Sequence, residues 1–423
     1  MDNYKTSYLL ILFLLLLGAC VSTKKIHKKV NKTFPFSSDN HFTGIMVYDP
    51  ELKDTIVQYN SSKYFTPASN VKIFTLYTAL KLLADEVPAL KYFISNDTTY
   101  IEGTGDPSFL HPKFKDSTAY NFIKASKYIA LNLDNFYEET FGPGWAWEDY
   151  DFSFAPERNA LPLYGNVICL TNNEDARVYP KYFETNIEFN SKGRYRDRNE
   201  NKFYIDSLGK DTLYIPYITK DSVILALLKD ELKKEIILKS PFPKGTKKTL
   251  LGMSRDSLAK EMMQQSDNFI AEQFLILGSS TISDSLSSKK TIDYMLENYL
   301  MDLNQMPRWV DGSGLSRYNL FSPASIVHVL NAMYSEYPKE RLLNIFAVGG
   351  ESGTIKEWYN GNPTPYIYAK TGTLGNNHCL SGYLKTDSGK TLIFSIMNNH
   401  FKQPVSEIKL RMQELLAYIK VNY

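Results

Sequence analysis

Both ends of the chain carry one kind of pattern, and the middle carries another. Apolar alternation at 44–48 and 55–59, around the turn at Asp49-Pro50, predicts a β-hairpin near the start. At the other end, the same reasoning predicts three strands and a closing helix, at 366–373, 380–385, 391–398 and 405–419. Between about 93 and 245 the sequence changes to short runs rich in Tyr, Thr and Phe. We therefore expect an α/β domain that is assembled from both chain ends and interrupted by an inserted domain.

The boundaries follow from where the pattern changes. We expect the α/β domain to comprise residues 39–92 and 246–423, and the inserted domain to comprise residues 93–245. Apolar spacing of three and four residues predicts further helices. In the α/β domain these cover 67–83, 255–277 and 322–334, and in the inserted domain one covers 117–131.

Charge and cysteine content exclude several classes of function. The chain has 423 residues and 48 Lys and Arg against 46 Asp and Glu, a formal net charge of +2. This balance gives no electrostatic reason to expect a nucleic-acid partner, which usually needs a clustered basic surface. The His and Cys residues show no metal-ligand spacing, so we expect no metal and no cofactor. Cys169 and Cys379 lie in apolar surroundings and favour buried free thiols, although a disulfide between them stays open.

The N-terminus has the pattern of a secretion signal. Lys5 precedes an apolar run from Tyr8 to Leu17 that is too short to span a bilayer comfortably. The run ends in Leu-Gly-Ala-Cys, which resembles a bacterial lipobox with Cys20 as the lipidated residue. We expect residues 1–19 to be a lipoprotein signal peptide, residues 20–38 to be a solvated basic tether, and acyl chains on Cys20 to hold the protein on a membrane. An ordinary signal peptide with a chance Cys is the alternative.

Ser69 and Lys72 form the first candidate catalytic pair. Three residues apart on a helix, their side chains share one face. A neutral lysine amine there can take the proton of the serine hydroxyl and make it a nucleophile. Alone the signal is weak, because Ser-x-x-Lys occurs at six places in this chain: Ser22, Ser69, Ser207, Ser257, Ser287 and Ser406.

Two further motifs follow in the chain. Ser266-Asp267-Asn268 lies in or beside a predicted helix, where Ser and Asn are unfavourable without a local role. Lys370-Thr371-Gly372-Thr373 lies on a predicted strand and occurs once. Lysine and threonine can bind a carboxylate, and a glycine in a strand allows another backbone to approach closely. A peptide substrate can then add along this strand edge.

Together the three motifs point to one kind of enzyme. Ser-x-x-Lys, Ser-Asp-Asn and Lys-Thr-Gly are the joint signature of penicillin-binding proteins and class A β-lactamases. Along nearly its whole length the chain resembles the class C low-molecular-mass penicillin-binding proteins, of the D-alanyl-D-alanine carboxypeptidase/endopeptidase type. The other segments that carry the resemblance are 105–107, 143–149, 311–317, 349–354 and 380–383. The long interval between Lys72 and Ser266 is also typical of that family and is longer than in class A β-lactamases.

The resemblance implies a fold. It predicts a five-stranded antiparallel sheet flanked by helices, of the β-lactamase/transpeptidase type, with an inserted mostly-β or α+β domain. The segment 375–378 after the third motif departs from the family pattern. The insertion is also shorter than in the family's larger members, so we expect one of their two inserted domains to be reduced or missing.

The resemblance also implies roles for individual residues. Ser69 would be the nucleophile, Lys72 the general base, and Ser266 the relay of the proton to the leaving group. Asn268 would orient the substrate, and Gly372 would lie on the strand edge along which the substrate binds. Lys370, Thr371 and Thr373 would bind its terminal carboxylate. The backbone N–H groups of Ser69 and Thr373 would form the oxyanion hole. Arg317 is a candidate substrate contact or a structural ion pair, and Asp134 is a candidate residue at the mouth of the site.

The implied activity is hydrolysis of peptidoglycan stem peptides. The enzyme would be a serine D-Ala-D-Ala carboxypeptidase, a DD-endopeptidase, or both, and β-lactams would acylate it. It would work in the bacterial envelope, in the periplasm, with an outer-membrane anchor favoured. Two alternatives stay open: a β-lactamase or esterase with the same nucleophile, and a non-catalytic muropeptide-binding lipoprotein.

Overall fold

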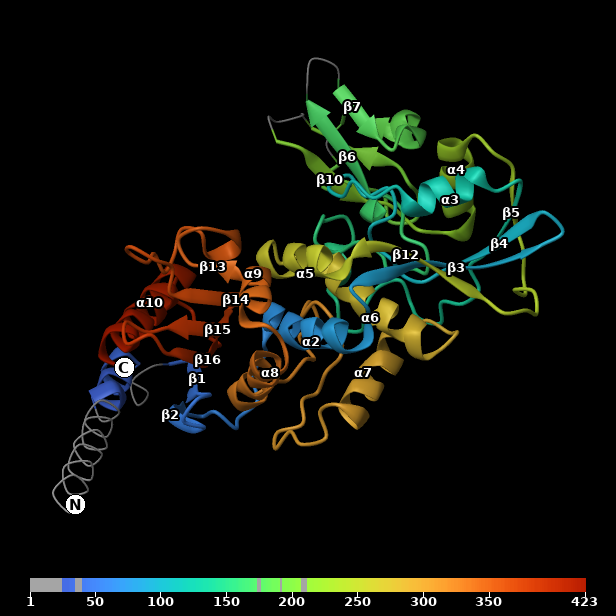
Figure 1. The fold of residues 1–423 in the computed structure, drawn as a ribbon. Helices are drawn as coiled ribbons and strands as arrows, with labels where there is room; N and C mark the ends of the chain where they lie inside the picture. Colours follow the sequence, from blue (N-terminus) through green and yellow to red (C-terminus); the bar gives the residue numbers. More distant parts are fainter. Residues whose placement is uncertain (1–24, 35–39, 173–175, 191, 207–210) are drawn as a thin grey trace, which may run out of the picture.

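The computed structural model describes residues 25–34, 40–172, 176–190, 192–206 and 211–423. The predicted signal peptide and Cys20 lie outside this part of the chain. Figure 1 shows two units joined near the middle of the molecule. One unit holds the blue start of the chain together with its orange and red end, and the other holds the cyan and green middle.

The first unit contains a six-stranded antiparallel sheet in the order β13-β14-β15-β16-β1-β2. Its strands are β1 (Phe42–Asp49), β2 (Asp54–Tyr59), β13 (Ala347–Val348), β14 (Ile367–Leu374), β15 (Asn377–Lys385) and β16 (Thr391–Asn399). Five of them are the strands that the sequence predicted. The sixth, β13, is a two-residue edge strand, too short to leave a pattern. The two chain ends join where β1 pairs with β16, with Ile45 opposite Ile396.

Both faces of this sheet are covered. Side chains alternate along a strand, so on β15 Cys379 and Tyr383 enter one hydrophobic core while Leu380 and Leu384 enter another. Burial on both faces explains why β16 contains a nearly continuous apolar run, from Leu392 to Met397.

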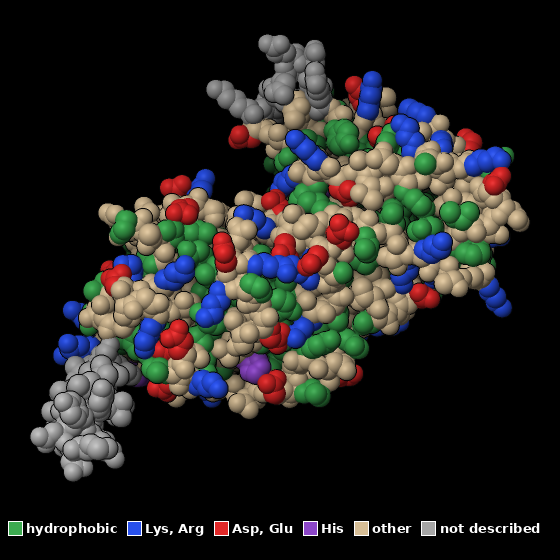
Figure 2. Space-filling model, viewed as in Figure 1, with side chains coloured by type: hydrophobic (Ala, Val, Ile, Leu, Met, Phe, Trp, Pro, Cys, Tyr) green, Lys and Arg blue, Asp and Glu red, His purple; other side chains and the backbone are tan. Residues whose placement is uncertain are grey.

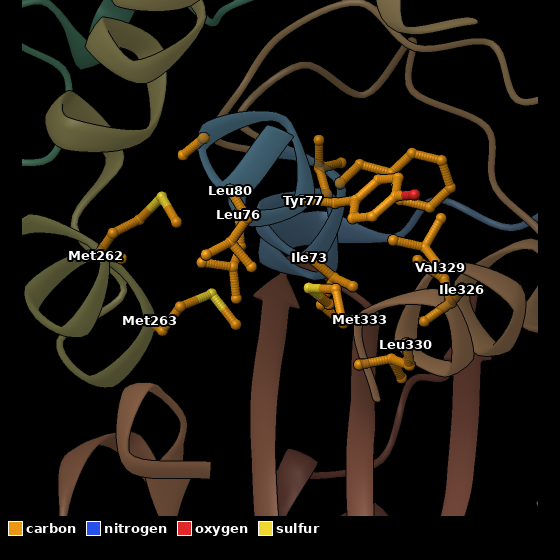
Figure 3. Packing of buried hydrophobic residues seen from close by; sticks show 14 of the residues in the cluster. Ile73, Leu76, Tyr77, Leu80, Met262, Met263, Ile326, Val329, Leu330 and Met333 are labelled. Carbon is orange, nitrogen blue, oxygen red and sulfur yellow. The ribbon is translucent and has the colours of Figure 1, made fainter. Parts of the chain in front are cut away.

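Helix α2 (Lys72–Leu82) lies at the centre of the first core. In Figure 3, Leu76 of α2 points toward Met262 and Met263 of α5, and Ile73 of α2 lies near Met333 of α8. The other helices that contribute to this core are α5 (Arg255–Gln264), α6 (Asn268–Ile282), α7 (Ser288–Asn298), α8 (Pro323–Glu336) and α9 (Lys339–Ile345). Residues on almost every face of α2 are buried, so its position is fixed from all sides.

The second core lies between the sheet and α10 (Val405–Asn422). It also contains Ile26, Val30 and Phe34. Residues 25–33 are helical, and the spacing of four residues puts Ile26 and Val30 on one helix face, with Phe34 directly after the helix end. The prediction of a solvated tether is therefore wrong for this segment, because an apolar stripe lies among its lysines. Lys29 pairs with Glu414 of α10 at 3.7 Å.

The described residues of the second unit form three sheets and a separate core. A five-stranded mixed sheet has the order β11-β5-β4-β3-β12, and a three-stranded antiparallel sheet has the order β10-β6-β7. A short parallel sheet pairs β8 (Ile187–Glu188) with β9 (Phe203–Tyr204). The strands of the two larger sheets are β3 (Glu86–Ser95), β4 (Thr98–Gly103), β5 (Tyr128–Asn132), β6 (Val167–Asn172), β7 (Ala176–Tyr179), β10 (Leu213–Pro216), β11 (Ile236–Leu238) and β12 (Lys248–Ser254). Its two α-helices in the described residues are α3 (Thr118–Ala125) and α4 (Asp221–Leu232). The helix predicted at 117–131 thus ends at Ala125, and its last residues form β5.

The chain crosses between the units at two points that lie together. Arg255, the first residue of α5, donates from Nη1 to Leu83 O (2.6 Å) and pairs through Nη2 with Asp85 (3.0 Å). The expected boundary at 92/93 falls inside β3, and the one at 245/246 falls before β12. Since both strands pair in the second unit's sheet, we propose that the inserted unit extends from about residue 86 to 254.

Figure 2 shows basic and acidic side chains interspersed on the face in view. Cys169 is half-buried and Cys379 is buried, and both are free thiols. Within the described ranges, no helix has the length and apolar character needed to cross a bilayer.

We expect Phe74→Ala to destabilise the first unit. The Phe74 ring is fully buried and packs edge-on against Phe321 (4.8 Å between centroids) and Trp309 (5.4 Å). Removing it leaves a cavity that lowers the free energy of unfolding by about 3–5 kcal/mol. Chemical denaturation measures this change. The control Phe42→Ala, at a side chain that is 63% exposed, should stay within about 0.5 kcal/mol of the parent. Equal midpoints for the two variants would contradict the packing described.

Candidate active site

Ser69 and Lys72 lie at the N-terminal end of α2. Ser69 belongs to a short 3-10 turn, η1 (Ala68–Val71), that leads directly into the helix. Lys72 is fully buried, and its Nζ lies 2.9 Å from Ser69 Oγ. Ser69 itself is half-buried, so its hydroxyl lies where a solvent-side ligand can meet a buried amine.

Two more oxygen atoms hold the Lys72 amine. Its Nζ donates to Asn268 Oδ1 (2.6 Å) and to the backbone oxygen of Ser313 (2.7 Å). Burial lowers the pKa of Lys72 to about 8, against the opposing effect of the nearby Asp311, Asp267 and Glu272 carboxylates. The amine is therefore close to losing its proton at neutral pH.

Ser266 lies in a break between two helices. The helix predicted at 255–277 is divided into α5 and α6, and Ser266 has a φ of +61° in the connection. Asp267 then caps α6, because its carboxylate accepts from the Ile270 N–H at 2.9 Å. The cap makes Asn268 the first residue of α6 and points its Oδ1 at Lys72.

Lys370 lies on β14 and faces the same place. Its Nζ donates to Ser266 Oγ (2.8 Å) and to Thr371 O (2.8 Å). Burial, reinforced by the charge of Lys72, lowers the pKa of Lys370 well below its ordinary value. The Thr371 hydroxyl contacts the Thr354 hydroxyl at 2.7 Å, whereas Thr373 is exposed.

Two glycines let the backbone segments meet around Ser69. A Cβ on Gly372 of β14 would lie 2.5 Å from Pro67 O and 2.9 Å from Ser69 N. A Cβ on Gly314 would lie 2.0 Å from Ala68 O, and Gly314 also has a φ of +85°. Both positions require glycine, since a methyl group would meet backbone atoms that cannot move aside cheaply.

The loop that contains Gly314 is organised by the buried Asp311 carboxylate. Asp311 Oδ1 accepts from Gly314 N (2.9 Å) and Asn319 Nδ2 (2.7 Å), and Oδ2 accepts from Ser316 N (2.7 Å). Glu272 of α6 accepts from Ser313 N at 2.8 Å. These bonds fix the Ser313 carbonyl that holds Lys72.

The inserted unit contributes directly to the site. Trp145 Nε1 donates to Asp311 Oδ2 (3.0 Å), and the Phe154 carbonyl accepts from Asn268 Nδ2 (2.9 Å). The buried Arg158 lies 3.4 Å from Glu272. A cavity of about 220 Å³ beside Ser266 and Asn268 takes its other wall from the insert, from His111–Lys113, Ser153, Phe154, Pro156, Gly165, Val167 and Tyr214.

The structure therefore brings together Ser69, Lys72, Ser266, Asn268 and the Lys370–Thr373 strand. Arg317 is exposed, and its Nη1 lies 3.5 Å from Gly375 O, just beyond β14. Asp134 is also exposed. Burial and the charge of Asp134 raise the pKa of Asp221 at the start of α4.

The sequence did not reveal the supporting residues. Glu272, Arg158 and Trp145 act through tertiary contacts, and no local spacing relates them to Ser69. Burial and the charge of Glu148 raise the pKa of Asp149, in the segment noted only for its resemblance, and the charge of Arg317 opposes this shift. This segment contains Trp145 and Trp147, but the presence of two tryptophans does not by itself distinguish a core from a site.

We expect Gly372→Ala to impair the site more than the fold. The new methyl group would separate β14 from η1, so that labelling of Ser69 by a fluorescent β-lactam should slow at least about 100-fold, as for loss of an oxyanion contact. The matched control is Gly375→Ala, where the nearest atom to a Cβ is the flexible Arg317 Nη2 at 3.4 Å. If the Gly372→Ala variant were labelled as fast as the parent protein, this would contradict the close approach of β14 and η1.

Known proteins resemble this chain over most of its length. The family model described as "D-Ala-D-Ala carboxypeptidase 3 (S13) family" matches residues 28–185 and 220–419. The D-alanyl-D-alanine carboxypeptidase DacB of Haemophilus influenzae is 22% identical over 90% of each chain. The penicillin-sensitive carboxypeptidase A of Dictyostelium discoideum is 22% identical over 84% of this chain and 82% of its own.

The fold comparison agrees. The crystal structure of penicillin-binding protein 4 from Haemophilus influenzae superposes with a TM-score of 0.70 at 20% identity, covering 94% of this chain and 97% of that one. A predatory peptidoglycan endopeptidase from Bdellovibrio bacteriovorus superposes with a TM-score of 0.50 at 16% identity, covering 89% and 92%. Because the family model spans most of the chain, this protein belongs to the D-Ala-D-Ala carboxypeptidase 3 (S13) family of serine hydrolases.

Proposed function

We propose that this protein is a serine D-alanyl-D-alanine carboxypeptidase, a DD-endopeptidase, or both, acting on peptidoglycan stem peptides through an acyl-enzyme on Ser69. The observation that carries the proposal is the buried Lys72 amine, 2.9 Å from the Ser69 hydroxyl and lowered in pKa to about 8. A serine needs such a base to become a nucleophile.

The hydrogen bonds around Lys72 suit the role of base. A neutral amine has two N–H donors and one lone pair. Asn268 Oδ1 and Ser313 O are acceptors only, so they take the two donors. The lone pair is then left for the Ser69 hydroxyl. Ser69 Oγ attacks the carbonyl between two D-Ala residues as Lys72 accepts its proton, and the C–N bond breaks as the leaving amine receives a proton through Ser266. Water later hydrolyses the ester.

The strand β14 supplies the remaining parts of the proposal. The backbone N–H groups of Ser69 and Thr373 would stabilise the oxyanion, where one such donor is typically worth about 2.7–4 kcal/mol. Lys370, Thr371 and Thr373 would bind the terminal carboxylate. No carboxylate is among the causes of the Lys370 pKa shift, so a bound substrate carboxylate would supply the missing counter-charge and favour the protonated lysine.

Two further features support substrate binding along β14. Asn268, which would orient the substrate, presents its amide between Lys72 and the insert. Arg317 reaches past the end of β14 toward Gly375, which favours a substrate-side contact for this residue. β-Lactams would occupy the same place, and a relative, penicillin-binding protein 4 of Haemophilus influenzae, has been crystallised with a β-lactam.

We also propose that the protein works in the periplasm of a bacterial envelope, held to a membrane, with the outer membrane favoured, by lipid on Cys20. The support is the lipobox-like Leu-Gly-Ala-Cys sequence after a short apolar run. Globomycin, which blocks lipoprotein signal cleavage, should cause the precursor to accumulate, and Cys20→Ser should release the protein from membranes. Unchanged membrane association of Cys20→Ser would contradict the anchor.

One experiment distinguishes the proposed function from two others, a β-lactamase and a non-catalytic muropeptide-binding protein. A soluble form beginning after Cys20 is incubated with benzylpenicillin and followed by intact mass spectrometry. We expect a persistent adduct of one β-lactam, absent from Ser69→Ala, with the folded state of both proteins checked by circular dichroism. Rapid return to the free mass with destruction of the drug would indicate a β-lactamase, and no adduct on the folded parent would indicate a binding protein. Cross-linked and monomeric muropeptides then separate endopeptidase from carboxypeptidase activity.

The acylation rate should depend on the protonation of Lys72. The base acts only when neutral, so the second-order rate of acylation should rise with pH, with a midpoint near pH 8, and level off above it. Asp267→Asn should move the midpoint to lower pH, because the Asp267 charge raises the pKa of Lys72, while asparagine keeps the helix cap.

Stopped-flow acylation across pH measures both profiles. Glu261→Gln is the control, because that carboxylate pairs with Lys113 (2.6 Å) and is not among the groups acting on Lys72. A rate that is flat between pH 6 and pH 9 would argue against Lys72 as the base.

A further inference from the structure

His378 lies beneath a residue of the proposed carboxylate site. It belongs to the segment 375–378 that departs from the family pattern, and on β15 it stands directly opposite Thr373 of β14. The ring is 1% exposed, and its Nδ1 lies 2.8 Å from the exposed Thr373 hydroxyl. Its Nε2 is buried and has no hydrogen-bond partner among the described residues.

The protonation state of the ring is restricted. Burial lowers the pKa of His378 to about 3, and the charges of Lys409 on α10 and Lys370 on β14 act in the same direction. These two lysines are the charged groups that act on the ring from the elements around it. The imidazole is therefore neutral near pH 7, and one of its two nitrogens carries the proton.

The surroundings select between the two neutral tautomers. With the proton on Nε2, a buried N–H would have no acceptor, and orphaned buried N–H groups are rarer than under-satisfied acceptors. That tautomer would also make Nδ1 an acceptor, so that it would consume the single hydroxyl proton of Thr373. With the proton on Nδ1, the ring donates to Thr373 Oγ1, and the hydroxyl proton stays free for a ligand.

We propose that His378 is a positioning residue that, as the neutral Nδ1–H tautomer, holds the Thr373 hydroxyl as a hydrogen-bond donor to the substrate carboxylate. The role in binding rests on the proposed function, in which Thr373 contacts that carboxylate. A threonine alone can turn its hydroxyl proton toward any acceptor. When the His378 N–H donates to the Thr373 oxygen, the hydroxyl proton of Thr373 has to point away from the ring. A hydroxyl that is held as a donor favours anionic ligands over neutral ones.

The tautomer is tested directly in the free protein. Selective 15N-histidine labelling and long-range 1H–15N correlation spectra distinguish Nδ1–H from Nε2–H imidazoles, and the spectrum of His378→Asn identifies the resonances of this ring. We expect the Nδ1–H pattern, unchanged from pH 5 to pH 9. An Nε2–H pattern, or a titration in that range, would overturn the proposal.

Three variants test the role in binding. His378→Asn keeps an amide donor near the position of Nδ1, His378→Gln moves the amide toward the position of Nε2, and His378→Leu is apolar. Loss of one hydrogen bond worth about 1 kcal/mol predicts that the Gln and Leu variants are acylated by benzylpenicillin about fivefold more slowly. We expect a weaker apparent affinity with an unchanged limiting rate, and recovery of most of the loss in the Asn variant.

The outcomes separate this inference from the proposed function. Melting temperatures and the reaction of each variant with benzylpenicillin methyl ester, which lacks the carboxylate, report general damage to the site. The ester should react equally with parent and variants. If the parent is acylated and all three variants match it, or if all three lose rate equally with the acid and the ester, His378 has no positioning role. A folded parent that forms no adduct would refute the proposed function itself.

Discussion

The site depends on the burial of two lysine amines in one polar region of an otherwise apolar core. Lys72 and Lys370 are both fully buried, and burial lowers the pKa of each, with the charge of Lys72 lowering that of Lys370 further. Burying a cation is costly unless polar groups surround it. The contacts with Asn268, Ser313, Ser266 and Ser69 are what make this arrangement tolerable, and they are the same contacts that would serve acyl transfer.

The need to hold these polar groups explains the supporting loop and the inserted unit. Asp311 and Glu272 accept backbone N–H bonds that fix the Ser313 carbonyl, and Arg158 and Trp145 from the insert contact those same carboxylates. The insert is therefore more than a lid on the catalytic unit. Its residues contact the polar groups that surround Lys72, so a change in how the two units pack would alter the charge of this lysine.

The six-stranded sheet provides the rigid reference for this arrangement. β14 lies against η1 so closely that Gly372 has no room for a side chain, and β15 places His378 opposite Thr373. Because both faces of the sheet are buried, the strands cannot shift without opening one of two cores. Lys370, Thr371 and Thr373 are thus presented from a strand that packing holds in place.

The sequence by itself determined the motifs and most of the elements that carry them. Ser69, Lys72, Ser266, Asn268 and Lys370 were found from order and spacing, and the strands around β15 from apolar runs, because these signals are local. Only the tertiary structure decided that Ser266 lies in a helix break, that residues 25–33 pack on α10, and that Glu272, Arg158 and His378 support the site. Those contacts join residues far apart in the chain or on neighbouring strands, where no periodicity records them. Burial, which sets the pKa of each lysine, is likewise a property of the packed molecule and not of any segment.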